Sequence, residues 1–199
     1  MKVRQRSFHF WHFRVIKNNL EEFELIRNCQ RSESKAQEVL YARYADRMLR
    51  LAMRYIKAAA DAEDVMIISF TRVFGHIRTF NQRAEGSLEG WIRKIVVNES
   101  LMWLRRRHNF NLMETIDDGM PEPDLSQLAA LEARDILKLI ETLPIGYRTV
   151  FNLSVVEGYG HQEIAGLLEI SESTSRSQLF KAKVLLKKML TREGYQYGT

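Results

Sequence analysis

The chain has 199 residues, one cysteine and a formal net charge of +5, with 45% hydrophobic and 28% charged residues. One cysteine excludes an internal disulfide framework and a cysteine-rich metal site, and no apolar run is long enough to form a membrane helix. These properties predict a cytoplasmic globular protein of one domain or two small ones, without membrane insertion.

The first 20 residues form a basic N-terminal extension with five lysines and arginines and no acid. Removing these five from the 30 basic side chains leaves 25, which equals the number of acids in the chain. A nucleic-acid interaction therefore has to be argued from local clusters of charge. His9 and His12 have a spacing that metal ligands use, but zinc needs four ligands, so we expect no metal site there.

Apolar side chains recur at three- and four-residue spacing in both halves of the chain, and strand-like alternation is absent. The fold class predicted from this pattern is all-α. The expected helices cover Val39–Ile56, Val65–Phe80, Trp91–Leu104, Leu128–Leu143, Tyr147–Val156 and Leu179–Leu190. We expect Asp61 and Ser87 to be the N-caps of the second and third helices. We expect Gly158 to end the helix that precedes it in the chain, Tyr147–Val156.

Residues 111–124 have the composition of an acidic linker, with five acids, no base, and the prolines Pro121 and Pro123. Proline removes backbone donors and like charges repel one another, so we expect an extended and flexible segment. The linker divides the chain into two small helical domains, residues 21–110 and residues 125–192, with a tail at residues 193–199.

The predicted helix at Trp91–Arg107 contains five bases and one acid. On a helix, Lys94, Asn98 and Arg105 lie within about 40° of one another, and Trp91 flanks them. Such a stripe suits a nucleic acid, because bases stack on aromatic rings and phosphates attract cations. An equally good interpretation places Trp91 in the core and the final arginines at a solvated helix end. The opposite face should enter the core through Ile92, Val96 and Trp103.

The segment His161–Lys183 has the pattern of a helix-turn-helix motif, with Ser171 as the N-cap of its second helix. The expected buried seam is Ile164, Leu168, Ile170 and Leu179. The residues expected toward the DNA major groove are Glu172, Ser173, Arg176, Ser177, Phe180 and Lys181. The alternative is a helical hairpin with a solvated outer face. Glu169 stands where glycine is common, at a cost of about 1 kcal/mol if its φ is positive.

From Glu21 to Leu190 the chain resembles the extracytoplasmic-function (ECF) group of bacterial RNA polymerase sigma factors. The first half resembles sigma region two through Leu40, Tyr41, Tyr44, Asp61, Ala62, Glu63, Asp64, Phe70, Val73, Phe74, Phe80, Gly90, Trp91, Ile92, Ile95, Asn98, Leu104, Arg105 and Arg106. The second half resembles sigma region four through Leu143, Pro144, Arg148, Val150, Phe151, Leu153, Glu157, Gly158, Glu163, Ile164, Ala165, Leu168, Ile170, Ser171, Thr174, Ser177, Leu179 and Ala182.

The resemblance implies a non-catalytic subunit, without a cofactor, that binds core RNA polymerase and promoter DNA and that an anti-sigma factor can hold. It assigns the polymerase contact to Asp61, Asp64, Ile67 and Ile68. It assigns the −10 element to the loop Thr79–Ser87 and to Trp91, Lys94, Asn98 and Arg105. It assigns the −35 element to Ser173, Arg176, Ser177, Phe180 and Lys181, and the acidic linker to the RNA path of the polymerase.

Ile67 and Ile68 depart from the family, which usually has a glutamine and an acid at these two places. On a helix Ile67 lies about 200° from Val65 and should be exposed, whereas Ile68 can join the edge of the core face. This departure favours a second hypothesis, a helix-turn-helix repressor or activator that binds duplex DNA as a dimer without polymerase. A third is an interaction module that holds an inhibitory partner. No nucleotide-binding or nucleophile motif supports an enzyme.

Overall fold

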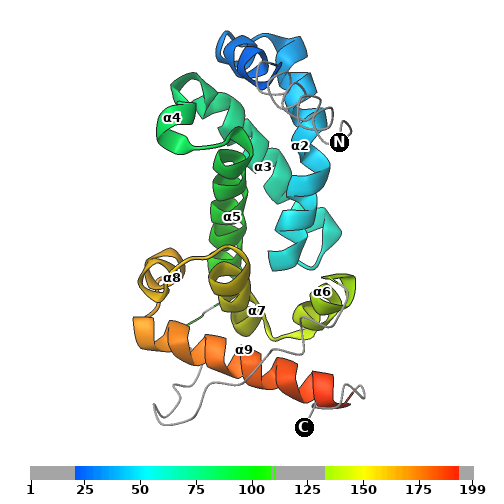
Figure 1. Cartoon of the computed structure of the whole chain (residues 1–199), viewed down its shortest axis with the longest axis vertical. Helices are drawn as coiled ribbons and strands as arrows, with labels where there is room; N and C mark the ends of the chain where they lie inside the picture. The colour runs from blue at the N-terminus through cyan, green and yellow to red at the C-terminus, as the bar shows by residue number, and fades with distance from the viewer. Residues whose placement is uncertain (1–20, 109, 111–132, 193–199) are drawn as a thin grey trace, which may run out of the picture.

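The structure is a computed structural model that describes residues 21–108, 110 and 133–192. Every regular element within these ranges is a helix (Figure 1). This confirms the all-α fold class. The N-terminal extension, the acidic linker, the start of the helix predicted at Leu128 and the tail lie outside the described residues.

The N-terminal domain is a bundle of three long helices. Residues 21–30 are helical and precede α2 (Ser34–Tyr55), α3 (Ala59–His76), the 3-10 turn Ile77–Thr79, α4 (Gln82–Glu85) and α5 (Leu88–Arg107). Each of α2, α3 and α5 packs against the other two. Large apolar side chains on their facing sides, such as Leu40, Tyr55, Ile92 and Leu104, are almost completely buried. Each such side chain stabilises the fold by about 1.5–3 kcal/mol.

The helix ends test the predicted caps of this domain. Ser87 is the N-cap of α5, and its Oγ accepts a hydrogen bond from the Gly90 backbone N–H at 3.1 Å, as predicted. The prediction for Asp61 was wrong, because α3 begins at Ala59 with Ala58 as its N-cap. Alanine is a strong helix former, so the helix extends past Asp61 toward its N-terminus. Asp61 lies in the first turn instead, where a carboxylate interacts favourably with the helix dipole.

The C-terminal domain contains α6 (Ala133–Thr142), α7 (Ile145–Phe151), a π-helical turn (Asn152–Val156), α8 (His161–Leu168) and α9 (Glu172–Arg192). In Figure 1 the long helix α9 runs across the bottom of the molecule, and α6, α7 and α8 all pack on it. Gly158 has a φ of 81°, which glycine adopts without strain, and it follows the π-helical turn as predicted.

Two pairs of described helices make the main contacts between the two domains. The end of α2 contacts α7, and the C-terminal half of α5 contacts α8 (Figure 1). These contacts place the first helix of the helix-turn-helix beside the basic end of α5.

The single cysteine, Cys29, lies in the core of the N-terminal domain with no exposed surface. Burial, helped by the nearby Glu33 carboxylate, raises the pKa of its thiol to about 11. Because the thiolate is the reactive form, this environment makes Cys29 an inert thiol.

We therefore expect Cys29 to react very slowly with a disulfide reagent such as DTNB at pH 8. A pKa near 11 leaves about one thiol in a thousand ionised at that pH, against about one in ten to one in four for an ordinary cysteine. The control is the same protein unfolded in guanidinium chloride, which should react at the rate of a free thiol. Equal rates for folded and unfolded protein would contradict the burial of Cys29.

Candidate nucleic-acid interface

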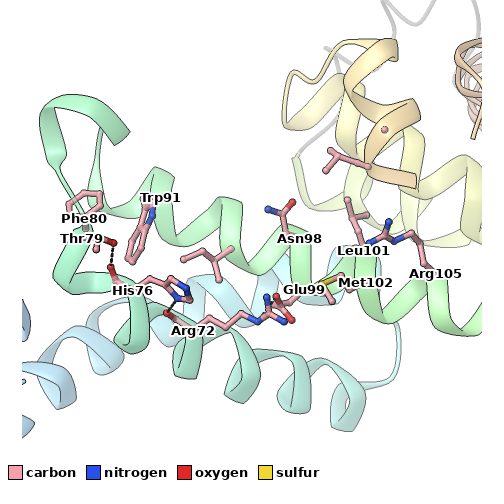
Figure 2. A pocket seen from close by; sticks show the side chains of 13 residues that line it. Arg72, His76, Thr79, Phe80, Trp91, Asn98, Glu99, Leu101, Met102 and Arg105 are labelled. Carbon is pink, nitrogen blue, oxygen red and sulfur yellow. Dashed lines mark hydrogen bonds and ion pairs between the residues drawn. The ribbon is translucent and has the colours of Figure 1, made fainter. Parts of the chain in front are cut away.

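A hollow of about 590 Å³ lies along α5, between the end of α3 and helix α8 (Figure 2). Three of the four residues assigned to the −10 element, Trp91, Asn98 and Arg105, line it. The fourth, Lys94, is exposed but does not line the hollow. The spacing on α5 that the sequence indicated therefore places an aromatic ring, an amide and a cation along one cavity.

Trp91 has features of a core residue and also of a residue that stacks on a base. Its ring packs against the buried Phe80 with centroids 4.9 Å apart and an interplanar angle of 42°. Figure 2 shows the two rings together at one end of the hollow. Trp91 remains half-buried, so part of the ring stays open to the cavity. Packing on Phe80 fixes the ring in position and leaves a surface on which a base can stack.

The hollow also contains an ion pair that the sequence did not indicate. Glu99 on α5 lies within 2.9 Å of the guanidinium of Arg72 on α3, and its side chain is only 8% exposed. A buried carboxylate without a partner would repel a nucleic acid and would be costly to desolvate. Arg72 balances this charge, so Glu99 does not leave an uncompensated carboxylate in the hollow. The pairing of Glu99 with Arg72 depends on the packing of α3 on α5, and no local sequence pattern indicates that packing.

The prediction that Ile92, Val96 and Trp103 of α5 enter the core is confirmed in part. Ile92 and Val96 have no exposed surface. Trp103 is half-buried rather than buried, and the guanidinium of Arg107 lies 4.3 Å from its ring centroid. Arg107 also pairs with Asp61 at 3.5 Å, which joins the end of α5 to the start of α3.

The helix-turn-helix seam is formed as the sequence predicted. Its four apolar members are at most 9% exposed: Ile164, Leu168, Ile170 and Leu179. Ser171 caps α9 by accepting the Thr174 backbone N–H at 3.0 Å. Glu169 has a φ of 58°, so the strain expected at this position is present. Its carboxylate pairs with Arg105 of the other domain.

His161 at the start of α8 is half-buried, and its Nδ1 lies 2.9 Å from the Oγ of Ser175. Ser175 is completely buried at the seam position where a small apolar residue is usual. The imidazole supplies the partner that its hydroxyl needs in the core.

The residues assigned to the −35 element differ in exposure along α9. Ser173 and Arg176 are exposed on the first two turns, and Arg176 pairs with Glu172 one turn earlier. Phe180 and Lys181 are half-buried, and Ser177 is only 6% exposed.

Gln178 is a neighbour that sequence analysis missed. Its side chain is 1% exposed, and its Nε2 donates a hydrogen bond to the carbonyl oxygen of Phe110 at 3.1 Å. The last described residue of the N-terminal domain therefore lies against α9.

The residues assigned to the polymerase contact lie near the start of α3. Asp64 and Ile67 are exposed, with 61% of Ile67 accessible, as expected. Ile68 is also exposed, at 46%, so it does not join the core face. On α2, the exposed Tyr41 packs edge-on against Phe70 of α3 with centroids 4.8 Å apart. The adjacent exposed side chains of Ile67 and Ile68 form a small apolar surface on α3, which follows the acidic residues Asp61 and Asp64 along the helix.

The described residues contain no group of three side chains with the character of metal ligands, and His9 and His12 lie outside them. None of the helices described is both long and apolar enough to cross a bilayer.

Two family models match this chain. One, described as Sigma-70 region 2, matches residues 40–110, and the other, described as Sigma-70, region 4, matches residues 133–186. The chain is 27% identical over 180 residues to the ECF RNA polymerase sigma-E factor of Haemophilus influenzae, which covers 84% of this chain and 94% of that protein.

Two further relatives show similar identity. The ECF RNA polymerase sigma factor SigE of Mycolicibacterium smegmatis is 28% identical over 160 residues, which is 77% of this chain and 61% of that protein. The RNA polymerase sigma-H factor of Pseudomonas aeruginosa is 24% identical over 183 residues, which is 85% of this chain and 94% of that protein. Among solved structures, CnrH in complex with the cytosolic domain of CnrY matches with 19% identity and a TM-score of 0.47, covering 85% of this chain and 97% of that chain.

Proposed function

The chain belongs to the ECF group of bacterial RNA polymerase sigma factors, and from that premise we propose how its two domains divide the recognition of a promoter. The protein directs promoter-specific transcription initiation by RNA polymerase. In our proposal, region two, residues 21–110, binds core polymerase and the −10 element, and region four, residues 125–192, binds the −35 element. The observation that carries this proposal is the presence of both regions, in this order, in one chain.

The hollow on α5 supports a role in capturing a base of the opened −10 strand. Extruding a base from a duplex costs a few kcal/mol, which a protein pocket has to offset. The Asn98 amide offers both donors and an acceptor to a base edge, and the open part of Trp91 offers a stacking surface. Arg105 at one end and Lys94 beside the hollow can contact phosphates.

The exposed first turns of α9 support a role in reading the −35 element. Ser173 and Arg176 have the exposure that a major-groove contact requires, and an arginine binds guanine through two hydrogen bonds. Lys181 suits a phosphate, and Phe180 a thymine methyl group. Ser177 is only 6% exposed, so it is the least accessible of the residues that we propose for this element.

The apolar surface on α3 supports a polymerase contact of unusual composition. Ile67 and Ile68 stand where the family usually has polar residues, and both are exposed. Apolar side chains that become buried against a partner stabilise the complex by release of water. Asp61 and Asp64 add acidic groups at the edge of the same surface, where they can meet basic residues of the polymerase.

We further infer that the protein is not an enzyme, needs no cofactor, acts in the cytoplasm, and can be held by an anti-sigma factor. The absence of nucleotide-binding and nucleophile motifs in the sequence supports the first inference. A cytoplasmic site of action follows from the location of bacterial RNA polymerase and its template.

The purified protein should support run-off transcription from its promoter only when core RNA polymerase is added. In the proposed function the chain supplies promoter recognition, and the polymerase supplies the catalytic activity that makes RNA. The measurement compares transcripts and promoter binding with and without core. Promoter binding that is equally tight without core would contradict the sigma-factor assignment and favour the dimeric repressor.

Arg176→Ala should weaken recognition of one or two base pairs of the −35 element by about 1–3 kcal/mol. Lys181→Ala should weaken binding to all sequences alike and lower the slope of log K against log salt by about one unit. Lys138→Ala, which removes an exposed cation on α6, is the control and should change neither. An unchanged base preference in Arg176→Ala, measured on a panel of −35 duplexes, would show that the reading residue lies elsewhere on α9.

The double variant Ile67→Gln/Ile68→Glu should bind core polymerase more weakly than the natural sequence. Fully burying an isoleucine stabilises by about 1.5–3 kcal/mol, and the substitutions remove that contribution. Val155→Gln, which removes an exposed apolar residue from the other domain, is the control. Tighter binding of the double variant would show that loss of the polar pair lowers the affinity of this sigma factor for core polymerase. Unchanged affinity would show that this face of α3 does not touch core polymerase.

A further inference from the structure

The first two turns of α9 contain no apolar side chain. Residues 172–178 have the sequence ESTSRSQ, and Leu179 is the first apolar residue of the helix. Four of these polar side chains are nevertheless at most 8% exposed: Thr174, Ser175, Ser177 and Gln178. Apolar packing is non-directional, whereas a hydrogen bond restrains both the distance and the angle between two groups. Hydrogen bonds therefore contribute directly to the orientation of this part of α9.

The hydrogen bonds of this segment differ in the elements that they connect. Thr174 donates its backbone N–H to the Oγ of Ser171, which is the N-cap of the same helix, at 3.0 Å. Gln178 donates to the carbonyl oxygen of Phe110 in the other domain. The Oγ of Ser175 lies 2.9 Å from the Nδ1 of His161, which is 14 residues earlier at the start of α8. Of these three contacts, the pair of His161 and Ser175 connects the two helices of the helix-turn-helix.

This pair extends the contact between α8 and α9 beyond the apolar seam. His161 precedes Ile164 by about one helical turn, and Ser175 precedes Leu179 by about one turn. Ile164 and Leu179 are buried members of the seam on the two helices. The polar pair therefore fixes the two helices at a second place, on the side of α9 that leads toward its N-terminus. In Figure 1, α8 lies above this end of α9.

Ser175 is next to the residues that we propose for reading the −35 element. Arg176 follows it directly, and Ser173 lies two residues before it. Successive side chains on a helix are about 100° apart, so the burial of Ser175 against α8 determines the direction in which Arg176 points. A rotation of α9 by about 10° moves a side-chain end about 5–6 Å from the axis by about 1 Å. Recognition requires placement within about 0.5 Å, so such a rotation changes which base edge the guanidinium meets.

We propose that His161 is a positioning residue for the −35 element, and that its bond to Ser175 fixes the rotation of α9 that directs Ser173 and Arg176 toward the bases. The inference rests on the proposed function of region four, and it adds a residue that acts through Ser175 without touching DNA. A merely structural role would end once the buried hydroxyl is satisfied or removed. A positioning role predicts a change in base discrimination that persists after stability is restored.

The experiment uses holoenzyme reconstituted from core RNA polymerase and the natural chain or a variant. Selection from promoter fragments with a randomised −35 element gives the preferred sequence of the natural holoenzyme. The ratio of dissociation constants for single-base substitutions and for this sequence measures discrimination, and a change in affinity for core polymerase cancels in that ratio. Urea unfolding of each free chain measures stability. The variants are His161→Ala, Ser175→Ala, the double alanine variant and His161→Asn, and the control is Gln162→Ala, at an exposed position in the same turn of α8.

We expect His161→Ala to lower the free energy of unfolding, because it leaves the Ser175 hydroxyl buried without a partner. We expect the same variant to lower discrimination by about tenfold, the effect of a misplaced arginine–guanine contact. The double variant should regain stability close to that of Ser175→Ala, while its discrimination stays as low as in either single variant. His161→Asn places an amide near the position of Nδ1 and should retain most of the discrimination. Gln162→Ala should change neither quantity.

Recovery of discrimination together with stability in the double variant would overturn the proposal, because His161 would then serve only to satisfy a hydroxyl. Unchanged discrimination in His161→Ala and Ser175→Ala, with circular dichroism showing that both are folded, would overturn it as well. If His161→Ala does not fold, Ser175→Ala decides the question, because it removes the same bond and leaves no orphaned hydroxyl. A natural holoenzyme that selects no preferred −35 sequence would count against the proposed function of region four and with it against this inference. A natural preference that persists in all variants would leave that function standing and refute the role of His161 alone.

Discussion

The end of helix α2 imposes the constraint on which the arrangement of this protein depends. Its last carbonyl groups cannot be satisfied within the helix, and water has little access to them, because Tyr55 is completely buried. Arg148 and Asn152 supply the missing donors from the other domain. The π-helical turn that begins at Asn152 also carries the chain to Glu157, whose carboxylate meets Arg54. A helix end in one domain and a widened helical turn in the other thus fix how the two halves meet.

The contact between the domains requires the desolvation of a charged side chain, Arg148. Its side chain is 2% exposed, and removal from water lowers the pKa of its guanidinium. The group stays charged at neutral pH, because a guanidinium is not deprotonated in proteins. The charge is compatible with burial because two carbonyl oxygens, of Tyr55 and Glu141, accept hydrogen bonds from it. Tyr55 and Glu141 belong to different domains, so this buried side chain links the two.

The exposed isoleucines of α3 take no part in this interdomain contact. Ile67 and Ile68 lie on the side of α3 that packs on neither α2 nor α5 and remain exposed while the domains are together. These two side chains are therefore accessible to a partner while the domains are in contact. The chain also has little excess charge outside its first 20 residues, so its cations act through local placement, as Arg105 does at the hollow.

The sequence by itself determined the features that depend on neighbours within one or two helical turns. It predicted the helices, the Ser87 cap, the glycine at Gly158, the helix-turn-helix seam and the family, because helix periodicity and capping are local. Only the tertiary structure decided which distant side chains meet. Glu157 and Arg54 are 103 residues apart, and Glu157 and Arg93 are 64 apart. No periodic pattern records such a pair, because its existence depends on how whole helices pack, and that packing also decided the burial of Ser177 and the pairing of Glu99 with Arg72.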